Sequence, residues 1–177
     1  MYTELHWMDG PWPGKLAISA RPRGADWLYE ELNSWRKSGV DEVVSLLTPE
    51  EVDSLELQNE AAYSWDAGMQ FRSFPIIDRW VPASRSDALR FIEDLDRDLA
   101  AGKNVSIHCR QGIGRAGLIA ASLLVARGLQ PAGAFERISL ARGVAVPETA
   151  EQRAWVDALA SELAGFGHPL LKDTVKE

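Results

Sequence analysis

The sequence predicts an α/β protein in which a central, mostly parallel sheet carries helices on both faces. Short apolar, β-branched runs alternate along the chain with longer segments of helical periodicity, a pattern typical of βαβ units. The run at 105–107 is followed by a glycine loop and then by an Ala-rich apolar segment over 116–126. This loop is therefore expected at the carboxyl end of a central strand, ahead of a buried helix. Ligands bind at this end of the strands in such sheets.

Four strands are expected, over 16–19, 41–48, 70–76 and 105–107. The run at 41–48 is short, continuous and rich in valine and leucine, which favours a strand buried on both faces. The strand over 70–76 contains Pro75, which favours its end or an edge position. Residues 1–13 show no clear period and are expected to form an irregular lead into the first strand.

Helical segments alternate with these strands. Asp26 is expected to cap the first, Thr48 with Pro49 to begin the second, and Ser84 to begin the third. The second is expected to run as one helix to about residue 65, with its glutamates solvated. The acidic side chains of the third helix, Asp96 among them, are expected on the surface.

Further helices are expected over 116–126, from residue 131 and from about residue 148. The tail over 166–177 is expected to be loosely held. With no internal repeat and no linker composition, the chain is expected to form a single domain over 1–177.

Composition limits the possible partners and compartments. The 177 residues carry a formal net charge of −7, which disfavours nucleic acid and anionic membranes as partners. No apolar run approaches the ~20 residues that span a bilayer, and no signal pattern begins the chain, so we expect a cytoplasmic protein. We also expect it to be a monomer. The single cysteine, Cys109, excludes an intramolecular disulfide.

The loop that begins at Cys109 has the chemistry of an anion site. Its backbone N–H groups and the N-terminus of the following helix are expected to converge on one point, which favours a thiolate and binds phosphoryl oxygens. Arg115 closes the loop with a planar guanidinium that can hold two of those oxygens. Gly112 and Gly114 let the backbone curl around the anion without Cβ clashes.

The sequence HCRQGIGRAG resembles the signature loop of the cysteine-dependent protein tyrosine and dual-specificity phosphatases, His-Cys-x5-Arg followed by Ser or Thr. The resemblance covers about 74–152, and the chain's length resembles the small, atypical, kinase-associated branch. It implies Cys109 as nucleophile and His108 as a supporting residue that shapes the loop. The substrate-binding residues that it implies are Arg110, Gln111, Gly112, Ile113, Gly114, Arg115 and Ala116.

Two more residues complete the expected catalytic set. Displacement of an alkoxide or phenoxide needs a proton donor on a separate loop, and Asp78 follows a strand upstream of the signature, as the general acid does in this family. The alternative is that Asp78 pairs with Arg79 or caps a turn. Gln152 occupies the place of a family glutamine that positions the attacking water, or is an exposed helix residue. Arg79 and Arg110 either add positive potential at the entrance of the phosphate-binding site or are surface charges.

One position departs from the family pattern. The hydroxyl that normally follows the arginine is absent here, because the residue is Ala116. Loss of this hydrogen bond makes the sulfur a poorer leaving group, and we expect a rate loss of roughly tenfold to a hundredfold, mainly in the breakdown of a phosphocysteine.

The function expected from these residues is hydrolysis of phosphate monoesters without metal or cofactor. The expected substrates are phosphotyrosine or phosphoserine/threonine on proteins. A small phosphorylated metabolite such as an inositol phosphate is the first alternative. A phosphate-binding module impaired by Ala116 is the second, and a sulfurtransferase of the rhodanese kind is the third.

Overall fold

The computed structural model describes residues 1–166, in which five strands form one sheet with the order β1-β2-β5-β3-β4. β2, β3, β4 and β5 run parallel, and only β1 is antiparallel to its neighbour β2. The bounds of the strands are β1 (His6–Met8), β2 (Leu16–Ser19), β3 (Glu42–Ser45), β4 (Gln70–Ser73) and β5 (Val105–His108). The predicted α/β fold with a mostly parallel sheet is confirmed.

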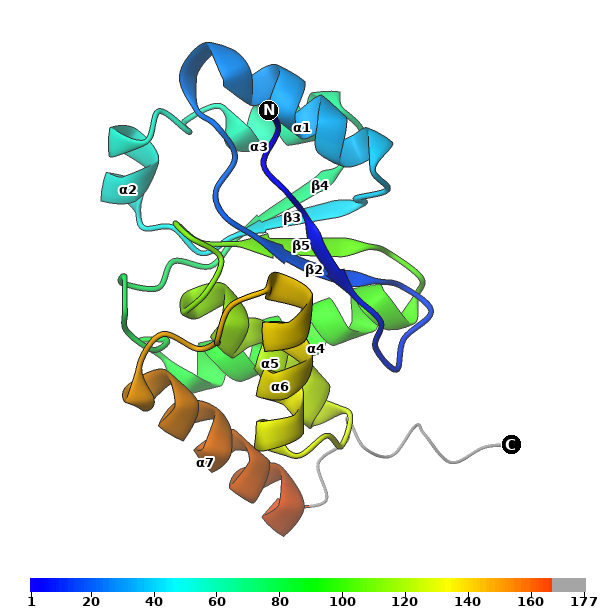
Figure 1. The fold of residues 1–177 in the computed structure, drawn as a ribbon, viewed down its shortest axis with the longest axis vertical. Helices are drawn as coiled ribbons and strands as arrows, with labels where there is room; N and C mark the ends of the chain where they lie inside the picture. Colours follow the sequence, from blue (N-terminus) through cyan, green and yellow to red (C-terminus); the bar gives the residue numbers. More distant parts are fainter. Residues whose placement is uncertain (167–177) are drawn as a thin grey trace.

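Helices cover both faces of this sheet (Figure 1). One face carries α1 (Leu28–Lys37), α2 (Pro49–Ser54) and α3 (Glu60–Asp66). The other carries α4 (Arg85–Ala100), α5 (Arg115–Ala126), α6 (Pro131–Arg142) and α7 (Ala150–Phe166). Each face has its own hydrophobic core. Within residues 1–166, no helix combines the length and apolarity that crossing a membrane requires.

β5 lies in the middle of the sheet and sets the position of the loop that follows it. Ser19, His108 and Ser45 are register partners across β2, β5 and β3, so these strands end at the same edge. α5 begins directly after the loop, and every one of its residues is buried. A helix that is apolar on all sides packs inside the protein, which fixes the loop between a central strand and a buried helix as predicted.

The expected irregular lead contains a strand. His6, Trp7 and Met8 pair antiparallel with Ile18, Ala17 and Leu16, so this part of the prediction is wrong. Three residues are too few to show a period of two, and β1 forms because the edge of β2 is available for pairing. Of the expected tail over 166–177, only Phe166, which ends α7, lies within the described residues.

The expected long helix after Pro49 is two helices. α2 ends at Ser54 and α3 begins at Glu60, and between them Glu56 has a left-handed φ of 56°. At this break Gly24 approaches so closely that a Cβ on it would lie 2.0 Å from the Leu55 carbonyl oxygen. This contact joins distant segments, so helical periodicity did not reveal it.

Helix starts were predicted with mixed success. The Thr48 hydroxyl and the Glu51 carboxylate form a reciprocal capping box, and the Ser84 hydroxyl accepts from the Asp87 N–H at 3.2 Å, as expected. The expected cap at Asp26 is wrong, because Asp26 lies inside a short 3-10 turn, Ala25–Trp27, that precedes α1.

Asp96 is buried, which corrects the prediction of a surface charge. Its carboxylate accepts from Arg127 Nε and Nη2, both at 2.7 Å, and from the Trp12 indole N–H at 2.7 Å. The bond to Arg127 is bidentate, the strongest geometry for such a pair. It connects α4 to the end of α5, and therefore supports the helix that positions the loop.

Asp96→Asn is expected to lower the free energy of unfolding by about 3 kcal/mol, because the change leaves a mostly buried guanidinium without its anion. Urea unfolding at neutral pH measures this. Asp94→Asn, an exposed position on the same helix, is the matched control and is expected to change stability by less than about 1 kcal/mol. Equal effects at the two positions would contradict the stabilising role given to the buried Asp96–Arg127 ion pair.

Candidate active site

Cys109 follows β5 directly, and its thiol is almost completely buried at the base of the loop. The Gly112 N–H donates to Cys109 Sγ at 3.3 Å. Gly112 has φ +68°, and a Cβ there would lie 2.3 Å from the Ser19 carbonyl, so only glycine fits this turn. The backbone therefore turns tightly beside the sulfur and directs the Gly112 N–H toward it.

Arg115 is the first residue of α5, and its guanidinium is 1% exposed. Its Nη1 donates to Glu51 Oε2 at 2.7 Å and its Nη2 donates to Glu51 Oε1 at 3.0 Å. A third bond from Nη1 reaches the Ile76 carbonyl at 2.8 Å. These contacts fix the plane of the guanidinium beside the loop before any ligand arrives.

The charges of this pair depend on each other. Burial alone raises the pKa of Glu51, but hydrogen bonds from Arg115 and from the Thr48 N–H outweigh it and lower that pKa to about 2. Burial also opposes the charge of Arg115, yet the contact with Glu51 raises the pKa of Arg115. Both groups are therefore ionised at neutral pH.

Asp78 lies within reach of the same guanidinium. Arg115 Nη2 donates to Asp78 Oδ1 at 3.0 Å, while about half of the Asp78 side chain stays exposed to solvent. Asp78 lies in a tight turn in which the Trp80 N–H donates to the Ile77 carbonyl. The partner of Asp78 is thus Arg115, not Arg79 as the alternative had it.

His108 is buried behind the loop. Its Nε2 lies 2.6 Å from Glu60 Oε1 in α3, and its Nδ1 lies 3.3 Å from the Cys109 carbonyl oxygen. The imidazole also meets the Trp35 ring edge-on. These contacts hold the first peptide of the loop in place.

Gln152 is completely buried, so the alternative of an exposed helix residue is wrong. Its Oε1 accepts from the Glu148 and Thr149 N–H groups at 3.1 and 3.2 Å. Its Nε2 donates to the Trp80 carbonyl at 3.1 Å. Gln152 therefore joins the start of α7 to the turn that carries Asp78.

Arg142 at the end of α6 holds the loop from outside. Its Nε and Nη2 donate to the Gly112 and Gln111 carbonyls at 3.1 and 2.9 Å. In a trans peptide the C=O and the N–H point in opposite directions, so outward carbonyls direct the next two N–H groups inward. The sequence had indicated only a turn at Arg142.

The remaining loop residues take different positions. The Arg110 side chain is partly exposed and its Nε lies 3.3 Å from Glu51 Oε1. Ile113 packs against the core below the loop. Ala116 is fully buried and has no polar side-chain atom to offer to the sulfur.

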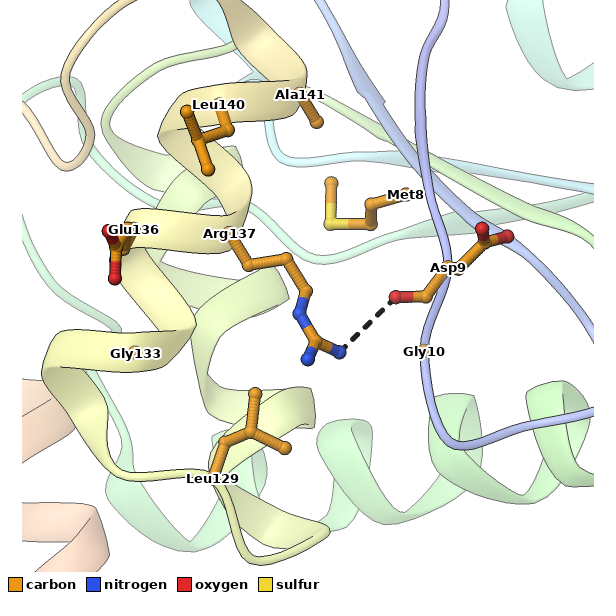
Figure 2. A pocket seen from close by; sticks show the side chains of 9 residues that line it. All are labelled: Met8, Asp9, Gly10, Leu129, Gly133, Glu136, Arg137, Leu140 and Ala141. Atoms are coloured by element: carbon orange, nitrogen blue, oxygen red, sulfur yellow. Dashed lines mark hydrogen bonds between the residues drawn. The ribbon is translucent and has the colours of Figure 1, made fainter.

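A small polar pocket of ≈ 40 Å³ opens above the thiol. Its walls are Asp78, Cys109, Arg110, Gln111, Gly114, Arg115 and Glu148. Most of the expected site residues thus meet in one place. A larger cavity of ≈ 790 Å³ lies elsewhere, between β1 and α6, where Arg137 donates to the Asp9 carbonyl at 3.3 Å (Figure 2). Its lining has no cysteine, so the small pocket is the candidate active site.

The sequence comparison identifies the family. A profile described as "Tc-R-P: Polymorphic toxin system, DSP-PTPase phosphatase" matches residues 18–129, which is more than half of the chain. The chain belongs to this family of phosphatases. No curated protein sequence matches the chain.

Solved structures of dual-specificity and tyrosine phosphatases share the fold. A kinase-associated phosphatase with serine in place of its catalytic-site cysteine superposes with a TM-score of 0.84 at 20% identity, covering 93% of this chain and 97% of that one. Tk-PTP in its active form gives 0.73 at 27% identity, over 91% and 99% of the two chains. PTPMT1 in complex with PI(5)P gives 0.72 at 17% identity, over 92% and 99%. The chain thus shares the fold of these phosphatases.

Sequence reasoning missed four residues of the site: Glu51, Glu60, Arg142 and Glu148. Glu51 and Glu60 were expected on a solvated face, but both are buried. Glu51 pairs with Arg115, and Glu60 pairs with His108. Thr48 and Glu51 at capping-box spacing marked the start of α2, yet this spacing carries no sign of a second partner for Glu51. Pairing across the fold cannot be inferred from local pattern.

Glu51→Gln is expected to lower the free energy of unfolding by about 3 kcal/mol at pH 7. The pKa of Glu51 is lowered to about 2 in the folded protein, from its ordinary value of 4.5. The stabilising effect of the ionised carboxylate is therefore complete above about pH 4.5 and is lost as the pH falls from about 4.5 to about 2.

Urea unfolding of both proteins between pH 7 and pH 3 measures this effect. We expect the stability difference to fall to about half at pH 3. Glu50→Gln, at the exposed neighbouring position, is the matched control. A difference that stays constant over the whole range would contradict the role given to the carboxylate.

Proposed function

We propose that the chain hydrolyses phosphate monoesters on proteins, phosphotyrosine and phosphoserine/threonine, through a phosphocysteine on Cys109. Membership of a phosphatase family supports phosphate-ester hydrolysis in general. The observation that carries the finer proposal is that Cys109, Arg115 and Asp78 line one pocket. A nucleophile, a phosphoryl-binding cation and a proton donor are the three groups that this reaction needs.

Substrate binding begins with an exchange of anions at Arg115. Nη2 of this guanidinium is bonded to both Glu51 and Asp78, and only Asp78 is half exposed. The incoming phosphoryl group takes the place of the Asp78 carboxylate, while the buried Glu51 stays and holds the guanidinium in plane. Asp78 then lies beside the phosphate dianion, where its carboxyl group can serve as the proton donor.

In the first chemical step, the Cys109 thiolate attacks phosphorus. The sulfur–phosphorus bond forms as the bond to the leaving oxygen breaks, and Asp78 gives its proton to that oxygen. Loop N–H groups and Arg115 stabilise the charge on the three outer oxygens. Arg142 supports this step indirectly, because it holds the Gln111 and Gly112 carbonyls away from the phosphate.

In the second step, water attacks the phosphocysteine, Asp78 accepts the proton from it, and the thiolate leaves. The Gln152 amide lies against the loop, since a Cβ on Gly114 would be 2.9 Å from its Oε1. We assign the orientation of this water to Gln152, whose Nε2 also donates to the Trp80 carbonyl. Ala116 gives the departing sulfur no hydrogen bond, so this step is the slower one.

Pocket size supports the dual specificity. A space of ≈ 40 Å³ holds little beyond the phosphoryl group, and no aromatic side chain is among its walls. The alcohol part of the ester therefore stays outside, so that aryl and alkyl phosphates can both be accepted. A small phosphorylated metabolite remains the alternative substrate.

Steady-state hydrolysis of p-nitrophenyl phosphate near pH 6 tests the proposal. We expect turnover that persists with a chelator and disappears in Cys109→Ser, because the sulfur is the nucleophile. Vanadate binding by the same variant reports whether its pocket is intact. Absence of turnover in a wild-type protein that binds vanadate would favour the phosphate-binding module.

Ala116→Ser is expected to raise kcat by roughly tenfold, since the new hydroxyl can stabilise the leaving thiolate. Rapid-quench kinetics on the wild type should show a burst of p-nitrophenol, because breakdown of the phosphocysteine is slower than its formation. We expect the burst to weaken in the variant. A wild type without a burst would show that Ala116 does not limit the second step.

A further inference from the structure

A second carboxylate, besides that of Asp78, lines the pocket, and none of the steps above uses it. Glu148 lines the same small space as Cys109 and Asp78. A Cβ added to Gly114 would lie 2.9 Å from Glu148 Oε2, so this oxygen lies against the loop itself. A negative charge at the wall of a pocket that binds a dianion is unfavourable, so its presence calls for a reason.

The position of this carboxylate is fixed from two sides. Arg79 Nη1 binds Glu148 Oε1 at 2.7 Å, and the Glu148 N–H donates to the buried Gln152 amide. Arg79 is itself fixed in a left-handed turn with φ 64°, beside Asp78. The ion pair is open to solvent, since the Arg79 side chain is 63% exposed. An exposed pair of this kind opens at little cost.

Three arginines and three carboxylates pair with one another around the pocket. The cations are Arg79, Arg110 and Arg115, and each is in contact with one or more of the anions Glu51, Asp78 and Glu148. One phosphoryl group is accommodated when Asp78 leaves Arg115. A second anionic group beside the first would lie next to the Glu148 carboxylate. Within residues 1–166, the two arginines that line the pocket, Arg110 and Arg115, are already paired with carboxylates.

We propose that Glu148 is a specificity-determining residue that selects phosphomonoesters with basic surroundings and rejects those with a second anionic group beside the scissile phosphate. This inference rests on the proposed function. A lysine or arginine next to the phosphorylated residue takes the place of Arg79 on Glu148. A neighbouring carboxylate or phosphate is repelled by the same group.

A simple structural role for Glu148, as a tether for the turn that carries Asp78, leads to a different expectation. Loss of a tether lowers turnover of all substrates by the same factor. Loss of a charge selector changes the ratio between substrates. Arg79→Gln separates the two roles, because it removes the tether and leaves the Glu148 carboxylate free of its cation.

The experiment uses two phosphotyrosine peptides that differ only in the residues on either side of the phosphotyrosine, lysine in one and glutamate in the other. The measured quantity is the ratio of their kcat/KM values for the wild type, Glu148→Gln and Arg79→Gln. We expect the wild type to prefer the lysine peptide. Glu148→Gln should reduce this preference about threefold to tenfold, the effect of one unit charge at several Å in a solvated site.

Arg79→Gln should increase the preference, and added salt should weaken it in the wild type. The inference is overturned if Glu148→Gln leaves the ratio unchanged, or if both variants shift it in the same direction. Dissociation constants of the two peptides, measured by calorimetry in a Cys109→Ser background, test the same ratio without turnover. An inactive wild type would refute the proposed function, and the binding ratio would still decide the role of Glu148.

Discussion

The buried ion pair between Arg115 and Glu51 is the constraint on which the candidate site depends. An arginine that is 1% exposed is tolerated only with an anion against it, and Glu51 accepts two hydrogen bonds from the guanidinium. This pair joins the start of α5 to the first turn of α2, across the edge where the strands end. It therefore determines where the guanidinium lies relative to Cys109.

A second buried carboxylate repeats this arrangement. Glu60, at the start of α3, lies 2.6 Å from His108, next to the nucleophile. The break between α2 and α3 lets Glu51 reach Arg115 while Glu60 reaches His108. One continuous helix over this segment would not place both carboxylates in these positions. The irregular segment is thus part of how the fold supports the site.

The central part of the fold and site was accessible from the sequence because it is local. A short apolar strand, a glycine loop and a mostly apolar helix follow one another, and the loop sequence from His108 to Arg115 resembles a family signature that implies the roles of Cys109 and Arg115. The position of Asp78 followed from the need for a proton donor, and the structure brings it to Arg115 at 3.0 Å.

What the sequence did not reveal depends on contacts between distant segments. Glu51, Glu60 and Asp96 resemble solvated charges in a helical pattern, because their partners lie elsewhere in the chain. β1 is too short to have a period, and it forms by pairing with β2. In each case the deciding partner is non-local, so propensity and periodicity carry no information about it.

The central claim is that phosphate passes through the Cys109 sulfur. The most direct test is to quench the protein in acid during turnover of an aryl phosphate and to map its peptides by mass spectrometry. The account predicts one phosphoryl group on the peptide that contains Cys109, and none in Cys109→Ser. Steady turnover without any phosphoryl group on that peptide, under conditions that preserve thiophosphates, would contradict it.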